Sequence, residues 1–214
     1  MMEVKNMVLA HGDRLLARDV SFRVHSGECL LLAGSNGCGK TTLLRALAGM
    51  GASTVLIPTG IPKVKGFTVE EFIRSGCFME SDWAGRLSAE TQRRMEGALK
   101  MLGIDALRDH DISTLSDGEF QKACIAVGLA RHADVLLLDE PTAFLDVENR
   151  IAVLGTLREL ARKTGMAVIF SSHDLHDALA VCNRVLAFTP GGGFLESRED
   201  NREEILRAAF PALA

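Results

Sequence analysis

The sequence predicts an α/β fold with a mostly parallel sheet, because short apolar runs alternate with amphipathic helices. The runs at 135–138 and 167–170 are unbroken, as expected of strands that helices cover on both faces. Each run follows a helical pattern, at 119–131 and at 151–163, and this alternation is typical of parallel sheets. With 214 residues, the chain has room for a single domain of this kind.

A glycine-rich loop follows an earlier apolar run at 29–33. Residues 34–42 fit the pattern G-x-x-x-x-G-K-T and lead into a helix predicted from Thr41 to Ala48. In such a loop the backbone N–H groups and the helix N-terminus face a polyphosphate. Lys40 then reaches the terminal phosphates, and the Thr41 hydroxyl can hold Mg²⁺. The loop therefore predicts a nucleoside triphosphate site rather than an ordinary glycine-rich turn.

Two acids end the apolar run at 135–138. Open α/β sheets bind ligands at the carboxyl ends of their strands, which is where Asp139 and Glu140 are expected. We expect Asp139 to serve the Mg²⁺ ion of the triphosphate and Glu140 to polarise a water molecule. In isolation, the pair could also be a solvated turn.

A histidine, His173, follows the strand expected at 167–170. In a doubly wound sheet it reaches the same crevice, where it could contact the γ-phosphate. It could instead be incidental to a helix start, or form a metal site with Asp174, His176 and Asp177. The phosphate loop and the acidic strand end already offer Mg²⁺ an oxygen cage, which favours the phosphate contact.

The remaining segments complete the predicted architecture. The region 68–115 has largely helical patterns, which predicts a helical subdomain inserted into the α/β core. Segments 184–188 and 194–197 flank a Pro-Gly-Gly-Gly turn and predict a hairpin, followed by a charged helix at 202–209. Segment 115–119, Leu-Ser-Asp-Gly-Glu, precedes an amphipathic helix. It is either a serine-capped helix start or a second anion-binding device that acts on a neighbouring copy's phosphate.

Composition excludes several classes of partner and location. The formal net charge is -4 with a pI near 5.9, and no block of Lys and Arg occurs, so nucleic acid is not an expected partner. No apolar run approaches the roughly 20 residues that span a bilayer, and residues 1–10 lack a signal-peptide core. We therefore expect a cytoplasmic protein whose five scattered cysteines are reduced packing residues.

Five motifs occur in a fixed order: the phosphate loop, segment 115–119, the acidic strand end, residues 144–146 (Phe-Leu-Asp) and His173. In this order they resemble the ATP-binding subunit of ABC transporters, and the resemblance covers nearly the whole chain. It implies a homodimer that encloses two ATP molecules between two copies. Each ATP would contact the phosphate loop of one copy and the segment 115–119, the family's signature segment, of the other.

The resemblance also implies individual roles. Glu140 would be the general base, His173 the γ-phosphate sensor and Asp146 a link between the two sites, while His11 stands where the family commonly places an aromatic ring against adenine. Catalytic roles are thus implied for Glu140, His173 and Lys40, metal binding for Thr41 and Asp139, and nucleotide contacts for His11, Gly34, Ser35, Asn36, Gly37, Cys38, Gly39, Lys40, Thr41, Thr42, Ser116, Gly118 and Asp146. The implied cofactors are ATP and Mg²⁺.

Three positions depart from the family pattern. Thr59 stands where the family carries a glutamine that would help hold Mg²⁺ and the attacking water. Roughly twenty residues appear missing between Gly49 and Val55, which predicts a reduced β-subdomain without the hairpin of relatives. The signature segment has Asp117 and Glu119 where Gly and Gln are common; a carboxylate at 117 is costly near a γ-phosphate unless it faces away.

The fold implied is a P-loop NTPase core with a mostly parallel sheet, an inserted helical subdomain and a reduced N-terminal antiparallel β-subdomain. We expect one ABC ATPase domain over 1–214, with N-terminal strands and phosphate loop at 1–66, helical subdomain at 67–115 and the rest of the α/β core at 116–214.

The function implied is an ATPase that powers import of a metal chelate such as siderophore-iron, haem or cobalamin. Integral membrane permease subunits would hold it on the inner face of the cell membrane, docked at the 68–73 region. The alternative is a soluble ABC ATPase with weak turnover, in regulation or metal-cluster assembly, which the missing glutamine would favour.

Overall fold

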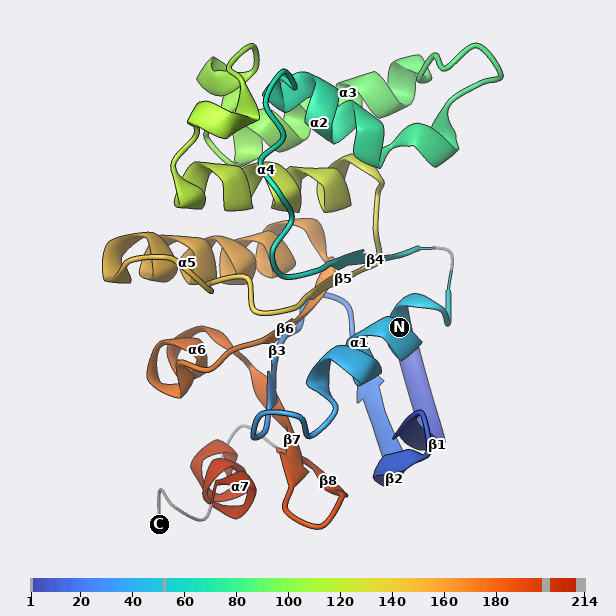
Figure 1. The fold of residues 1–214 in the computed structure, drawn as a ribbon, viewed down its shortest axis with the longest axis vertical. Helices are drawn as coiled ribbons and strands as arrows, with labels where there is room; N and C mark the ends of the chain where they lie inside the picture. The colour runs from blue at the N-terminus through green and yellow to red at the C-terminus, as the bar shows by residue number, and fades with distance from the viewer. Residues whose placement is uncertain (1, 52, 198–200, 211–214) are drawn as a thin grey trace.

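The computed structural model describes residues 2–51, 53–197 and 201–210, and it confirms the predicted α/β class (Figure 1). The strands are β1 (Met2–His11), β2 (Arg14–Val24), β3 (Cys29–Ala33), β4 (Thr54–Ile57), β5 (Val135–Leu138), β6 (Ala167–Ser171), β7 (Arg184–Thr189) and β8 (Gly193–Glu196). The α-helices are α1 (Lys40–Ala48), α2 (Val69–Gly76), α3 (Ala89–Met101), α4 (Asp117–Ala130), α5 (Val147–Thr164), α6 (Leu175–Val181) and α7 (Arg202–Ala209). Three short 3-10 helices are η1 (Phe78–Glu80), η2 (Asp105–Leu107) and η3 (Ile112–Thr114).

The central sheet has the strand order β4-β5-β6-β3-β7-β8. All neighbours are parallel except β7 and β8, which form the hairpin predicted near the C-terminus. Because β5, β6 and β3 are adjacent and parallel, their carboxyl ends meet at one edge of the sheet. The acidic pair, the histidine segment and the phosphate loop leave from those three ends.

The apolar core lies on both faces of this sheet. Along β3, Cys29, Leu31 and Ala33 pack into a cluster with α4, α5 and α6, whereas Leu30 and Leu32 pack with α1 and the β1–β2 pair. All five β3 residues are buried. An unbroken apolar strand is therefore required here, since alternate side chains enter two different layers.

The region 68–115 is helical, as predicted, and lies at one end of the molecule over α4 (Figure 1). Helix α2 begins with a capping box, in which Thr68 accepts from the Glu71 backbone N–H while the Glu71 carboxylate accepts from that of Thr68. Val69 and Ile73 are fully buried. Val69 and Ile73 therefore belong to the core of the helical region, while docking of a membrane partner at 68–73 stays a prediction.

The N-terminal β-subdomain is reduced to the β1–β2 pair, as predicted. After α1, the Thr54 N–H donates to the Gly51 carbonyl, and the Ser53 carbonyl next to β4 accepts from the Asp134 N–H. Within the described residues of this segment there is no hairpin. In those parts of the chain that the structure describes, no helix is long and apolar enough to cross a membrane.

The cysteines are free thiols. Four of them are buried, and burial raises the pKa of the Cys29 thiol to about 12. Cys38, in the phosphate loop, is partly exposed. The buried thiols thus act as small apolar packing groups, as predicted.

Candidate functional site

The phosphate loop joins β3 to α1 and holds its lysine in place. Gly39, the N-cap of α1, has φ 119°, a conformation that side-chain-bearing residues rarely adopt. Lys40 is only 6% exposed, and its Nζ donates to the carbonyls of Gly34 at 2.8 Å and Ser35 at 3.3 Å. The loop's own backbone thus positions the ammonium group beside the exposed turn of the loop, which is the predicted phosphate site.

Asp139 is fixed through both carboxylate oxygens. Oδ2 accepts from the Thr41 hydroxyl at 2.7 Å, and Oδ1 accepts from the Ser171 hydroxyl at 2.9 Å. The carboxylate is 8% exposed. Thr41 and Asp139, from α1 and the end of β5, therefore present neighbouring hard oxygen atoms, which is the ligand chemistry that suits Mg²⁺.

Glu140 and His173 are brought together, as the sequence predicted of two strand ends. Oε1 of Glu140 lies 2.6 Å from Nε2 of His173. Glu140 adopts φ 51°, uncommon for a residue with a side chain, and its backbone N–H donates to Ser171 Oγ at 2.8 Å. The turn after β5 thus directs the carboxylate toward the histidine and holds it there.

Sequence reasoning missed Ser171. This residue is fully buried at the end of β6 and bonds both acids of the neighbouring strand end. The sequence contains little indication of this role, because a serine at the end of an apolar run is typical of a strand terminus. Only the β5-β6 pairing brings Ser171 to Asp139.

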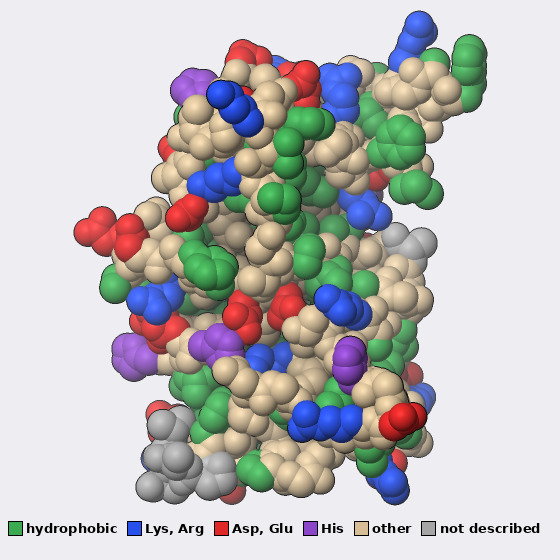
Figure 2. Space-filling view, in the orientation of Figure 1, with side chains coloured by type: hydrophobic (Ala, Val, Ile, Leu, Met, Phe, Trp, Pro, Cys, Tyr) green, Lys and Arg blue, Asp and Glu red, His purple; other side chains and the backbone are tan. Residues whose placement is uncertain are grey.

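A cavity of about 460 Å³ lies between the phosphate loop and the β1–β2 turn. Its lining residues are His11, Arg14, Leu16, Asn36, Gly37, Gly39, Lys40, Thr41, Thr42, Glu140 and His173. Most of the predicted nucleotide contacts thus surround one space. The face in Figure 2 has acidic, basic and histidine side chains close together across its middle.

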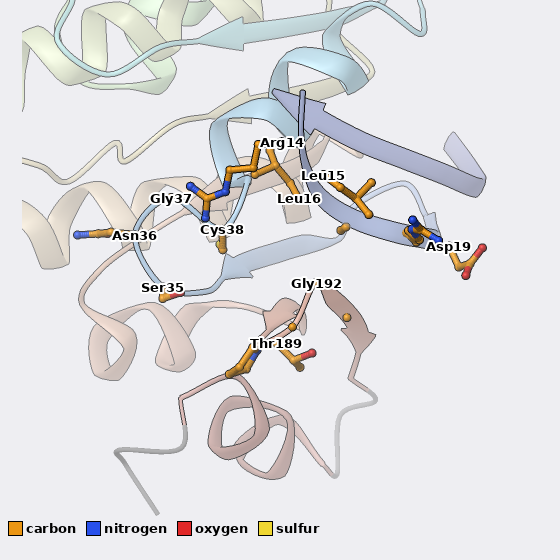
Figure 3. Close-up of a pocket in the computed structure, with 15 residues that line it drawn as sticks. Arg14, Leu15, Leu16, Asp19, Ser35, Asn36, Gly37, Cys38, Thr189 and Gly192 are labelled. Carbon is orange, nitrogen blue, oxygen red and sulfur yellow. The ribbon is translucent and has the colours of Figure 1, made fainter. Parts of the chain in front are cut away.

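Arg14 is a second residue that sequence reasoning missed. It pairs directly with His11 across the β1–β2 turn, so the two side chains flank the same cavity. Figure 3 shows its guanidinium group turned toward the loop at Gly37. The two-residue turn Gly12-Asp13 between two strands was the available signal, since it places His11 opposite Arg14.

A second cavity, of about 580 Å³, lies on the other side of the phosphate loop (Figure 3). It is bounded by Arg14 to Asp19, Ser35 to Cys38 and the β7–β8 turn. Although larger, it is lined by neither Lys40 nor Glu140. The smaller cavity is therefore the candidate triphosphate site, and Ser35 and Cys38 border the larger one.

Ser116, Gly118 and Asp146 do not line the candidate triphosphate site of their own chain. Ser116 is the N-cap of α4, in a capping box with Glu119: its Oγ accepts from the Glu119 N–H, and the carboxylate accepts from the Ser116 N–H at 2.9 Å and its hydroxyl at 2.8 Å. These bonds lower the pKa of Glu119. Asp146 is the N-cap of α5 and accepts from the Asn149 N–H at 2.8 Å. A Cβ on Gly118 would lie 2.5 Å from the Asn149 side chain, so any larger residue would displace Asn149 where the two helix starts meet.

Thr59 bonds to the acidic strand end directly. Its hydroxyl donates to the backbone carbonyl of Asp139, not to the carboxylate. A cavity of about 110 Å³ lies beneath this contact, lined by residues that include Thr59, Lys63, Asp117 and Glu140. Thr59 therefore acts on the position of the strand end, where a glutamine had been the expected residue.

The alternative metal site around His173 has no support in the structure. Asp174 and Asp177 both pair with Arg150, and the His176 side chain is exposed. Among the described residues no three His, Cys, Asp or Glu side chains converge to hold a metal ion.

The chain is similar to several known proteins. Residues 17–143 match a family model described as "ABC transporter". The chain is 30% identical to the probable siderophore transport system ATP-binding protein YusV of Bacillus subtilis, over 92% of this chain and 80% of that protein. It is 31% identical to the petrobactin import ATP-binding protein FpuC of Bacillus anthracis, over 89% and 79%. Among solved structures, an inward-facing metal-chelate type ABC transporter superposes with a TM-score of 0.87 at 26% identity, covering 98% of this chain and 88% of that one.

Proposed function

This chain belongs to the ABC transporter family as an ATP-binding, ATP-hydrolysing subunit, and on that premise we propose that it powers import of a metal chelate. The observation that carries the proposed catalytic site is the Glu140–His173 pair at 2.6 Å, next to the phosphate loop. A carboxylate and an imidazole at this edge can act on the terminal phosphate of ATP and on the attacking water.

Each step of hydrolysis has a residue suited to it. Glu140 would orient the water and take its proton as the new P–O bond forms. Lys40 would contact the β- and γ-phosphates while the bond to ADP breaks, and His173 would contact the γ-phosphate oxygens. His11 and Arg14 would hold the adenine and phosphate ends of the nucleotide from the β1–β2 turn.

Thr41 and Asp139 would hold Mg²⁺. Their oxygen atoms are 2.7 Å apart, and both suit a small, hard cation. When bound there, Mg²⁺ neutralises charge on the β- and γ-phosphates. Ser171 keeps the Asp139 carboxylate in position for this role.

Two copies would form the complete site. Ser116 and Gly118 stand at the start of α4, and Asp146 at the start of α5, outside the triphosphate cavity of their own chain. A second copy could present the same residues to this chain's γ-phosphate, since a helix N-terminus with a serine hydroxyl binds anions. A symmetric homodimer would satisfy both sites at once.

The permease partner would dock on the helical subdomain at 67–115. Three large apolar side chains are exposed in the short segment 78–83 there, Phe78 at 68%, Met79 at 85% and Trp83 at 99%. We call them the Trp83 patch. Hydrophobic side chains gather over this segment, between α2 and α3, at the outer end of the helical region (Figure 2). Such exposure favours a protein partner, and in an ABC transporter subunit that partner would be a membrane permease component. This would bring the chain to the membrane surface.

The cargo follows from the relatives. The two relatives described above are named for siderophore and petrobactin transport, and the solved structure for a metal chelate. A siderophore-bound iron would thus be the cargo, ahead of haem or cobalamin. Retained Glu140 and His173 argue against the alternative of a module with weak turnover.

Two experiments test this function. Glu140→Gln should lower ATP turnover at least about a hundredfold while the chain still binds ATP. The control Glu148→Gln, on the exposed start of α5, should leave ATP turnover unchanged. With the permease in lipid vesicles, the wild-type chain should drive ATP-dependent uptake of siderophore-bound radioiron. ATP turnover by the complex without uptake of any metal chelate would overturn the proposed cargo class.

A further inference from the structure

Asp117 is an acidic residue in an unfavourable place. It lies between Ser116 and Gly118, the two residues proposed to face the γ-phosphate held by a second copy, and its side chain is 58% exposed. ATP bound at that site carries several negative charges, so a free carboxylate within a few ångströms would repel it. An acidic signature segment needs a compensating charge.

Lys63 supplies that charge. Its Nζ lies 2.6 Å from Oδ1 of Asp117 and donates to the Leu115 carbonyl at 2.7 Å. It also stands 5.7 Å from the ring centroid of Phe120, and its side chain is only 25% exposed. Three groups of the signature region therefore hold one ammonium group in a defined position.

The chain segment that carries Lys63 also contacts the acidic strand end. Lys63 lies in the segment that leaves β4 for α2, four residues after Thr59, whose hydroxyl binds the Asp139 carbonyl. Thr59 and Lys63 line one cavity together with Asp117 and Glu140. One short segment thus touches both the acidic strand end and the signature segment.

We infer that Lys63 is a positioning residue, the counterion of Asp117 that lets an acidic signature segment approach ATP held by a second copy. This inference rests on the proposed function, because the ATP concerned is bound across the dimer. The ion pair is partly exposed, so it adds little to folding stability. Its effect is on the electrostatic potential at the γ-phosphate. The positive charge of Lys63 offsets the negative charge of the Asp117 carboxylate, so the surface no longer repels the phosphate.

The test uses the full-length chain with Glu140→Gln, which keeps ATP unhydrolysed, and follows dimerisation by light scattering against Mg-ATP concentration. Lys63→Ala should raise the concentration for half-maximal dimerisation roughly tenfold. Lys63→Arg should keep it near the parent value. Lys65→Ala, on the same segment and exposed, is the matched control and should also have no effect.

Asp117→Gly separates charge from structure. Added to Lys63→Ala, it should restore dimerisation, since position 117 then carries no carboxylate that needs Lys63, and the defect of Lys63→Ala alone should shrink at high salt. Binding of a fluorescent ATP analogue to the monomer should be the same in all these variants.

Three results would overturn the inference. If Lys63→Ala dimerises like its parent, or if Asp117→Gly fails to restore it, Lys63 does not act through Asp117, and the proposed function stands. If the Glu140→Gln parent binds ATP but never dimerises, the shared site is wrong, and the role of Lys63 fails with it.

Discussion

The hydroxyl of Ser171 donates a hydrogen bond of 2.9 Å to the Asp139 carboxylate. The same oxygen accepts a bond of 2.8 Å from the Glu140 backbone N–H. One buried serine on β6 thus fixes both acids at the end of β5. It bonds the side chain of Asp139 and the backbone of Glu140. A residue that does not line the candidate triphosphate cavity can therefore set the geometry of the site.

We predict that Ser171→Ala slows ATP hydrolysis by about ten- to a hundredfold and raises the Mg²⁺ concentration needed for half-maximal rate. The Asp139 carboxylate loses one of its two donors, so it binds the ion less well. Steady-state rates over a Mg²⁺ titration measure this. The control is Ser197→Ala, which removes a buried hydroxyl that accepts from the Val185 N–H, remote from the phosphate loop. Equal rate losses in both variants would mean a general loss of stability.

Arg14→Ala should weaken ATP binding by roughly three- to tenfold, because an exposed guanidinium group beside the phosphate loop attracts the triphosphate. The loss should be smaller for ADP and for either nucleotide at high salt. Calorimetric titration of the isolated chain at two salt concentrations measures it. Arg18→Ala is the matched control, since Arg18 is on the same strand but lines only the larger cavity. An equal effect of both substitutions would assign the result to net charge alone.

The sequence was sufficient for the parts of the fold that depend on local pattern. The unbroken apolar run at 135–138 is β5 to the residue, and the charged segment at 202–209 is α7. Both were predictable because burial on two faces requires a continuous apolar strand, and a helix shows its own period. The phosphate loop was equally clear, since its glycines and lysine are needed at fixed spacing.

The site contacts that escaped prediction depend on which strands are neighbours. Ser171 reaches Asp139 only because β6 lies between β5 and β3, an order that no local pattern contains. Lys63 and Asp117 are 54 positions apart, and the structure alone pairs them. Thr59 was noticed as a departure, but the direction of its hydrogen bond, to the Asp139 carbonyl, required the β4-β5 register.

The burial of Val69 and Ile73 was not predictable for a similar reason. A short amphipathic helix has an apolar face whether it packs inward or binds a partner, and the sequence does not distinguish the two. In the structure, Val69 and Ile73 face the core, and the most exposed large apolar side chains of the helical region are those of the Trp83 patch.

Charging the Trp83 patch should separate the chain from its permease. We predict that Trp83→Asp lowers co-purification with the membrane subunits at least about tenfold, because a desolvated carboxylate replaces a large apolar contact. ATP turnover by the isolated chain should not change. Val8→Asp, at another exposed apolar position on β1, serves as the control. Unchanged assembly of Trp83→Asp would place the docking surface elsewhere.

The start of α4 should lose stability in acid. Hydrogen bonds from Ser116 lower the pKa of Glu119 from its ordinary 4.5. A carboxyl whose pKa is lower in the folded state stabilises that state fully above the ordinary pKa, and this contribution is lost as pH falls through the lowered value. The melting temperature of the wild type should therefore exceed that of Glu119→Gln by roughly 1–2 °C near neutrality. The difference is small because the group is mostly exposed.

That difference should shrink as the pH falls below the ordinary pKa of 4.5 and vanish below the lowered pKa of Glu119, since both chains then carry an uncharged group at the third position of the helix. Other carboxylates titrate in the same range, so only the difference between the two chains is informative. Glu148→Gln, in the first turn of α5, provides the comparison for an acid outside a capping box. A difference that stays constant through this pH range would mean that the carboxylate charge is not what stabilises the helix start, and that the geometry of the cap alone suffices.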